Sequence, residues 1–287
     1  MAKVQDFNSP NFPTWCPGCG DFSIWGSLKQ SFAELGLEPH QFAVVYGIGC
    51  SGNMCSFVNA YGFEGLHGRG IPVAAGIKMA NPDLPVMMVG GDGDILGEGM
   101  GHFIHACRAN HNLNIVIHNN QVYGLTTGQT APTSEQGMKT KSTPHGVIEE
   151  QTNPIALALT AGATFVARGF AGDIPHLVKL MKAAIEHEGF AVLDVLQPCV
   201  TFNKVNTYAW FRERVYKMEE KGYAQTTKAA AIEKALEPWH TQIPLGIFWQ
   251  EKKPSYEDSL PQLKEKGPLP TRDLSKIDIT PLYEEFR

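Results

Sequence analysis

The chain has 287 residues, 43% of them hydrophobic and 18% charged, with a net charge of −5 and a pI near 6.1; this balance excludes a basic nucleic-acid-binding protein. Its glycines and prolines follow no period, which excludes collagen-like and low-complexity proteins, and no apolar run is long enough to predict a membrane span or a signal peptide. We therefore expect a cytoplasmic protein whose six cysteines are thiols or metal ligands rather than disulfides.

Helix-like and strand-like segments alternate between residues 21 and 200. A helix is expected from Asp21, a suitable N-cap, to Gly36, and the later segments are predicted as strands at 42–48, 84–91, 112–120, 164–168 and 190–196 and as helices at 72–81, 97–110, 153–161 and 173–187. Continuous apolar strands separated by helices are typical of a parallel sheet covered on both faces. We predict an α/β domain over residues 1–205, with a functional loop at 121–152.

The composition changes after Gln197. Residues 207–222 have the pattern of a charged amphipathic helix, and the chain from residue 251 onward is polar and rich in proline. We assign residues 206–287 to a C-terminal helix and an extended tail that packs on a partner chain. A loosely packed C-terminus is the alternative.

Two predicted turns carry side chains suited to a metal and a phosphate. Asp92 and Asp94 follow the strand 84–91 in a Gly-Asp-Gly-Asp turn, and Asn119-Asn120 ends the next strand along the chain. Because the carboxyl ends of parallel strands meet at one edge of the sheet, we expect these turns to lie side by side. Glycines and a helix N-terminus suit a diphosphate, and a carboxylate suits Mg²⁺. A tight turn and an asparagine-capped strand end are the structural alternative.

The glycine-rich stretch 65–70 presents His67 and Arg69 just before a predicted helix. These two side chains are candidates for contact with an anion or a cofactor, and an ordinary surface loop is the alternative.

Four of the six cysteines are expected at the same edge. Cys16 and Cys19 form a C-x-x-C knuckle, and Cys50 and Cys199 follow predicted strands. Four converging thiolates would bind zinc or a [4Fe–4S] cluster, and thiolate chemistry alone leaves both open. A c-type haem is excluded because Gly20 stands where that motif needs histidine. The other two, Cys55 and Cys107, are expected to be buried thiols.

The Gly-Asp-Gly and Asn-Asn pair resembles the motif of the thiamine diphosphate enzymes. Six stretches in order, "WCPGCG", "GIGCSGN", "LHGRGIPVAAGIK", "GGDGD", "NNQVYGLTTGQTAPTS" and "QPCVTFN", resemble the β subunit of a 2-oxoacid:ferredoxin oxidoreductase. The resemblance covers most of residues 12–205, and the loop that begins at residue 126 is similar to that of the 2-oxoglutarate-type members.

The resemblance implies roles for individual residues. Mg²⁺ would be held by the side chains of Asp92 and Asn120 and by the carbonyl of Val122, and one [4Fe–4S] cluster would be held by Cys16, Cys19, Cys50 and Cys199. Catalytic roles would fall to His67 and Arg69. The residues expected to contact the cofactor are Gly49, Cys50, Ser51, His67, Gly91, Asp92, Gly93, Asp94, Asn120, Val122, Gly124, Leu125 and Thr126.

The activity implied is the oxidative, CoA-dependent decarboxylation of 2-oxoglutarate to succinyl-CoA with ferredoxin as electron acceptor, in either direction. Pyruvate or a branched-chain 2-oxoacid is the alternative substrate, and a non-oxidative thiamine diphosphate decarboxylase or synthase with structural zinc is the alternative enzyme. Some broad-specificity relatives have a lysine where Asn53 stands. Arg69, Lys139 and Lys141 are candidates to read the distal carboxylate.

The resemblance also implies a partner. In these enzymes a glutamate from a second domain activates thiamine diphosphate, and the sequence contains no second domain of that type. We therefore expect an α subunit that supplies this glutamate and an (αβ)₂ assembly, with no nucleic acid and no membrane among the partners.

Overall fold

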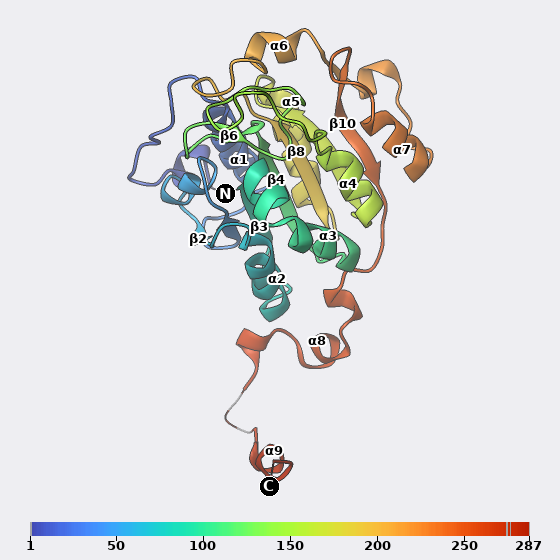
Figure 1. Cartoon of the computed structure of the whole chain (residues 1–287). Coiled ribbons are helices and arrows are strands. Elements are labelled where there is room, and N and C mark those ends of the chain that lie inside the picture. Colours follow the sequence, from blue (N-terminus) through green and yellow to red (C-terminus); the bar gives the residue numbers. More distant parts are fainter. Residues whose placement is uncertain (1, 274, 276, 287) are drawn as a thin grey trace.

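The computed structural model describes residues 2–286 except 274 and 276. Within this part of the chain, eight strands form one sheet in the order β2-β1-β3-β4-β8-β7-β10-β9 (Figure 1). Neighbouring strands are parallel except for β10, which runs antiparallel to β7. In sheet order, the strands are Tyr61–Glu64, Ala43–Tyr46, Val86–Gly91, Asn114–Asn119, Ala191–Leu196, Phe165–Phe170, Ile243–Gln250 and Val215–Lys217.

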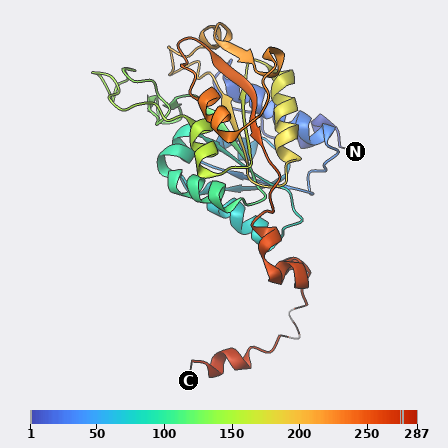
Figure 2. The ribbon, with the colours of Figure 1, turned by 90° about the vertical axis from the view of Figure 1, so that its right-hand side faces the viewer.

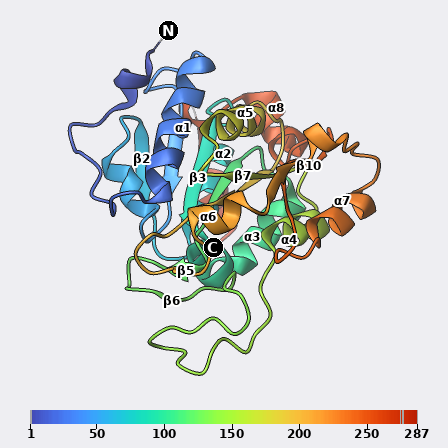
Figure 3. The same cartoon turned by 90° about the horizontal axis from the view of Figure 1, so that it is seen from above.

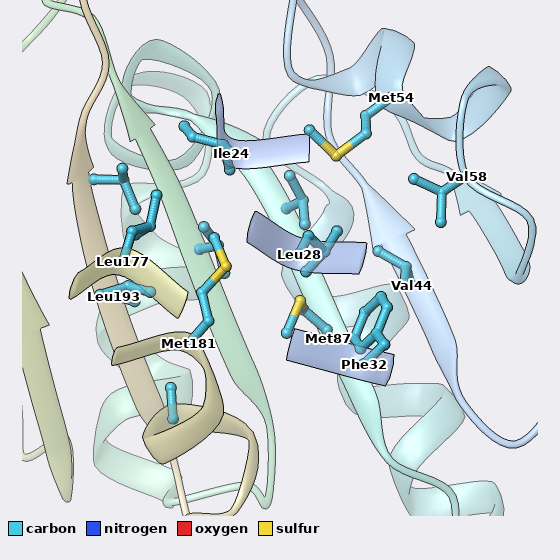
Figure 4. Close-up of a cluster of buried hydrophobic side chains, with 14 of the residues drawn as sticks. Ile24, Leu28, Phe32, Val44, Met54, Val58, Met87, Leu177, Met181 and Leu193 are labelled. Carbon is cyan, nitrogen blue, oxygen red and sulfur yellow. The ribbon is translucent and has the colours of Figure 1, made fainter. Parts of the chain in front are cut away.

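Helices cover both faces of the sheet (Figure 2). One face packs on α1 (Gly20–Glu34) and α5 (Ile174–Ile185), and Figure 4 shows side chains of these helices meeting those of the strands. The other face packs on α2 (Gly70–Ala80), α3 (Met100–Ala109), α4 (Pro154–Ala161) and α7 (Lys228–Ala235).

The strands alternate between these two cores because successive side chains point to opposite faces. In β3, Met87 and Val89 enter the first core, whereas Val86 and Met88 enter the second. A strand buried on both faces therefore needs a continuous apolar run, which is the pattern that the sequence shows there.

The α/β fold class and the order of the elements predicted between residues 21 and 200 are confirmed. The short edge strand β2 was not predicted from the sequence. The predicted helix over 207–222 is wrong, because α6 (Tyr208–Arg212) stops early and residues 215–217 instead pair with β10. Residues 208–250 therefore contribute two strands and α7 to the main body. The predicted helix and extended tail over residues 206–287 did not include these elements.

The chain after β10 is fastened to the turn before β4. The backbone N–H of Tyr256 donates to the carbonyl of Asn110 over 3.0 Å. The two carboxylate oxygens of Glu257 lie 2.7 Å from Nδ1 of His111 and 2.9 Å from the backbone nitrogen of Asn112. The segment then continues away from the sheet through α8 (Pro261–Lys266) and α9 (Thr280–Glu284) (Figure 1). Its packing on a partner chain stays a prediction.

Smaller elements complete the description. The antiparallel pair β5 (Val122–Tyr123) and β6 (Gln129–Thr130) begins the long loop that projects from the body in Figure 2. A π-helical turn spans Gly93–Glu98, and short 3-10 turns lie at Val4–Phe7, Gly52–Ser56, Glu219–Lys221, Glu257–Ser259 and Leu269–Thr271. No helix in the described part of the chain is long and apolar enough to cross a bilayer.

Candidate functional site

The site lies at the carboxyl ends of the parallel strands, the edge of the sheet on which β5 and β6 sit (Figure 3). Strand β3 ends at Gly91, and Asp92 precedes the π-helical turn. The next residue, Gly93, has to be glycine, because a Cβ there would come within 2.4 Å of the ring of Tyr123. Such π-helical turns occur often at functional sites.

The turn after β4 meets Asp92 directly. Gln121 has a left-handed backbone (φ 62°), and its N–H donates to Oδ2 of Asp92 over 2.9 Å. The hydroxyl of Thr133 donates to the same oxygen. Oδ1 of Asn120 accepts from the N–H of Val122 over 3.0 Å and keeps a second lone pair. The prediction that the two turns lie side by side is therefore confirmed.

Both aspartates of the turn are buried. Burial raises the pKa of Asp92 to about 7, although its hydrogen bonds oppose the rise. Burial also raises the pKa of Asp94, although two contacts at its Oδ1 oppose the rise. The N–H of Gly68 lies 2.8 Å and Nδ1 of His67 lies 3.0 Å from this oxygen. A bound divalent cation reverses this effect, since it favours the ionised carboxylates.

These turns enclose a cavity that we call the acidic cavity. It is lined by Ile48, Gly49, Cys50, Ser51, His67, Gly91, Asp92, Asp94, His118, Asn120, Val122, Tyr123, Gly124, Leu125 and Thr126. Three buried atoms of its lining have no hydrogen-bond partner among the described residues, namely Oγ of Ser51, Oδ2 of Asp94 and Nε2 of His118. Because buried polar groups are normally paired, these atoms fit a polar ligand in the cavity.

Most of the predicted contact residues line this cavity, with two exceptions. Gly93 is not among the lining residues, and the guanidinium of Arg69 donates instead to the carbonyls of Gly68 and Glu98. Lys139 and Lys141 are exposed in the loop and line neither the acidic cavity nor the cysteine cavity described next. Sequence reasoning missed three lining residues, Ile48, His118 and Tyr123.

A second cavity, the cysteine cavity, lies beside the first. Its lining includes the thiols of Cys16, Cys19, Cys50 and Cys199, and it holds about 160 Å³, more than ten times the ~10–15 Å³ that admits one water. The predicted convergence of these cysteines is therefore confirmed. Of the other two, Cys107 is fully buried in the core and Cys55 is half-buried against it.

Local hydrogen bonds shape the cysteine cavity. The N–H of Cys19 donates to the carbonyl of Cys16 over 2.9 Å, in a turn that needs Gly18 for its left-handed backbone (φ 82°). Trp15 closes the wall, and its indole N–H donates to the carbonyl of Cys50 over 2.7 Å. Burial raises the pKa of the Cys50 thiol to about 12. A bound metal deprotonates such a thiol outright.

Four residues belong to both linings: Cys50, Asn120, Gly124 and Leu125. Gly124 makes this wall thin, since a Cβ there would lie 3.4 Å from the sulfur of Cys50. Within the described residues, no group of three or more His, Cys, Asp or Glu side chains is arranged so that it could hold a single metal ion.

Comparison with known proteins places this geometry in a family. Residues 42–195 match the thiamine pyrophosphate enzyme, C-terminal TPP binding domain, and residues 199–265 match the C-terminal region of the pyruvate ferredoxin oxidoreductase β subunit. The chain is 44% identical to the 2-oxoacid:ferredoxin oxidoreductase 1 subunit beta of Aeropyrum pernix, over 99% of this chain and 94% of the relative. The chain belongs to the β subunits of the 2-oxoacid:ferredoxin oxidoreductases.

Two further proteins extend the comparison. The chain is 33% identical to the 2-oxoglutarate synthase subunit KorB of Methanocaldococcus jannaschii, over 88% of this chain and 93% of the relative. It also resembles the solved structure of a 2-oxoglutarate:ferredoxin oxidoreductase from Magnetococcus marinus, described with 2-oxoglutarate, coenzyme A and succinyl-CoA bound. That match has a TM-score of 0.91 and 38% identity, and it covers 100% of this chain and 96% of the other.

The oxidoreductase family predicted from the sequence is thus confirmed. As a β subunit, the chain works with an α subunit. Its thiamine diphosphate domain, residues 42–195, contains every residue that lines the acidic cavity.

Proposed function

We propose that this β subunit takes part in the reaction of 2-oxoglutarate, CoA and two oxidised ferredoxins to give succinyl-CoA, CO₂, a proton and two reduced ferredoxins, in either direction. Two similarities support 2-oxoglutarate as the substrate. The relative from M. jannaschii is named a 2-oxoglutarate synthase subunit, and the structure from M. marinus is described with 2-oxoglutarate and succinyl-CoA.

One observation favours an oxidative reaction over a non-oxidative decarboxylation. The acidic cavity and the cysteine cavity share a wall. When bound, thiamine diphosphate supplies a carbon nucleophile that attacks the 2-oxoacid and stabilises the carbanion left when CO₂ departs. A redox centre in the adjacent cavity would lie within electron-transfer reach of that carbanion.

The acidic cavity's own residues would bind and orient the cofactor. Asp92 and Asn120 would hold Mg²⁺ with their side chains, together with the carbonyl of Val122, because oxygen atoms are the ligands that Mg²⁺ prefers. The hydroxyl of Ser51 and the half-exposed imidazole of His67, which line the same cavity, would contact the diphosphate.

In the cysteine cavity, Cys16, Cys19, Cys50 and Cys199 would hold one [4Fe–4S] cluster. Four thiols around a space of about 160 Å³ fit a polynuclear group. The apolar side chains of Trp15 and Phe202 line the same space and would exclude water from it.

The partners are proposed from the family to which this β subunit belongs. The α subunit would supply the glutamate that activates thiamine diphosphate, in an (αβ)₂ assembly, and ferredoxin would receive the electrons. The β subunit alone should then not decarboxylate 2-oxoacids, and full activity of the isolated chain would contradict the proposal.

The substrate is tested with the anaerobically purified α–β complex. Reduction of ferredoxin or methyl viologen is measured with CoA and either 2-oxoglutarate, pyruvate or 2-oxoisovalerate. We expect the highest kcat/KM with 2-oxoglutarate. A higher value with either other substrate would reassign the specificity, and CO₂ release without electron transfer would favour a non-oxidative decarboxylase.

The cluster is tested by a matched pair of serine substitutions. Cys16→Ser should remove the broad absorbance near 400 nm and ferredoxin reduction while leaving thiamine diphosphate binding intact. Cys107→Ser, at a core cysteine that does not line the cysteine cavity, should keep the absorbance. A colourless wild-type protein that contains zinc would refute the redox proposal.

A further inference from the structure

A buried polar chain connects the two cavities. Oδ2 of Asp21 lies 3.3 Å from the sulfur of Cys19, and its Oδ1 lies 2.6 Å from Nδ1 of His118. Asp21 is 0% exposed and His118 is 1% exposed. Asp21 lines the cysteine cavity, whereas His118 lines the acidic cavity.

The far end of this chain is open towards the acidic cavity. When the imidazole of His118 is neutral and its Nδ1–H donates to the carboxylate of Asp21, Nε2 keeps its lone pair. That nitrogen is buried and has no partner among the described residues. This nitrogen is therefore set to accept a hydrogen bond from a ligand in the acidic cavity. In thiamine diphosphate the amino group of the pyrimidine can donate such a bond, whereas the diphosphate oxygens only accept.

We propose that the Asp21–His118 pair couples the two cavities, so that binding of thiamine diphosphate in the acidic cavity raises the electron affinity of the metal centre at Cys19. This inference rests on the proposed function, because it takes the cluster as the occupant of the cysteine cavity.

The coupling has a direct physical cause. A hydrogen bond accepted by Nε2 polarises the imidazole and strengthens the Nδ1–H bond to Asp21, since hydrogen bonds in a chain reinforce one another. The carboxylate then places less negative potential on the neighbouring sulfur of Cys19. Less negative potential at a ligand sulfur stabilises the reduced cluster.

Coupling between two sites is reciprocal, so it can be measured from either side. If thiamine diphosphate binds about tenfold more tightly to the reduced complex than to the oxidised one, the midpoint potential rises by about 59 mV for a one-electron couple. We expect an effect of this size in the wild-type α–β complex.

Gln197 provides a matched control at the same sulfur. Its side-chain Nε2 donates to the sulfur of Cys19 over 3.2 Å, and among the two cavities it lines only the cysteine cavity. Gln197→Leu should lower the midpoint potential, because a hydrogen bond to the sulfur is lost, and should leave the shift caused by thiamine diphosphate unchanged.

The experiment uses the anaerobic α–β complex with Mg²⁺, with and without thiamine diphosphate. The midpoint potential is followed by electron paramagnetic resonance, and the Kd of thiamine diphosphate is measured on oxidised and dithionite-reduced protein. In Asp21→Asn and His118→Phe, the tenfold difference in Kd should fall below threefold. Because asparagine has the same shape as aspartate, the Asp21→Asn result alone decides the test if His118→Phe fails to fold.

Three results would overturn the inference while leaving the proposed function in place. These are equal affinities in the two redox states of the wild type, a full difference retained in Asp21→Asn, and loss of the difference in Gln197→Leu as well. A wild-type complex with no cluster signal at all would overturn the proposed function, and this inference with it.

Discussion

Replacing Arg168 by methionine should cost the protein several kcal/mol of stability. Nε of Arg168 lies 2.9 Å from Oδ2 of Asp194, and both side chains are fully buried. Removing one partner of a buried ion pair leaves an uncompensated charge and costs about 3–5 kcal/mol. At roughly 2 °C per kcal/mol for a chain of this size, the melting temperature should fall by about 6–10 °C.

The pair is also connected to the site. The other oxygen of Asp194 accepts from Nδ2 of Asn119 over 3.0 Å, and Asn119 precedes the proposed magnesium ligand. Arg168→Met should therefore weaken thiamine diphosphate binding as well as stability, because a side chain that holds the end of β4 loses its own support.

Thermal unfolding of the variants, followed by circular dichroism, tests this reasoning. Lys182→Met is the control, because Lys182 pairs with Glu34 at the surface, where such a pair contributes less than about 1 kcal/mol. The double variant Arg168→Met with Asp194→Leu should recover much of the loss. A melting temperature of Arg168→Met no lower than that of Lys182→Met would refute the assigned role of the pair.

Three further predictions concern other contacts. Gly93→Ala should lower thiamine diphosphate affinity at least tenfold in calorimetry, because the new methyl displaces Tyr123 from the cavity wall; unchanged affinity would contradict this. Burial disfavours the ionised form of Glu251, but hydrogen bonds from Lys228 and Lys253 outweigh this effect and lower its pKa to about 2. The ionised carboxylate therefore stabilises the folded protein fully above pH ~4.3, and this stabilisation is lost as the pH falls through 2. The stability gap between wild type and Glu251→Gln, under ~1 kcal/mol because the pair is partly exposed, should therefore shrink from pH 5 to pH 2 in denaturant titrations, and a constant gap would refute this. Glu257→Gln should release the segment held at His111 and speed limited proteolysis near residue 260, while an unchanged cleavage rate would show that the contact is not what holds it.

Local patterns predicted which residues lie close together where those residues follow strands. The distance in sequence between Asp92 and Asn120 placed their two turns at one edge, and the bond from Gln121 to Asp92 shows that they meet there. Cys50 and Cys199 were located by the same rule, since both come directly after apolar strands. A parallel sheet turns such positions into neighbours whatever lies between them.

What the sequence could not predict depends on contacts between distant segments. His118 sits inside an apolar strand, and only the packing of α1 brings Asp21 against it. Residues 215–217 have a helical pattern, yet they form a strand because β10 offers them a free edge. Arg69 was assigned to the cavity from its glycine-rich context, but two nearby carbonyls engage its guanidinium.

The spread of the four cysteines along the chain has a consequence during synthesis. Cys16 and Cys19 leave the ribosome well before Cys199, which follows β8. At translation rates of ~5–20 residues per second, the first two thiols wait roughly 10–40 s for the last one. Throughout that time they are open to oxidants and to stray metal ions. A cell that makes this subunit in air therefore risks damage to the knuckle before the sheet that protects it exists.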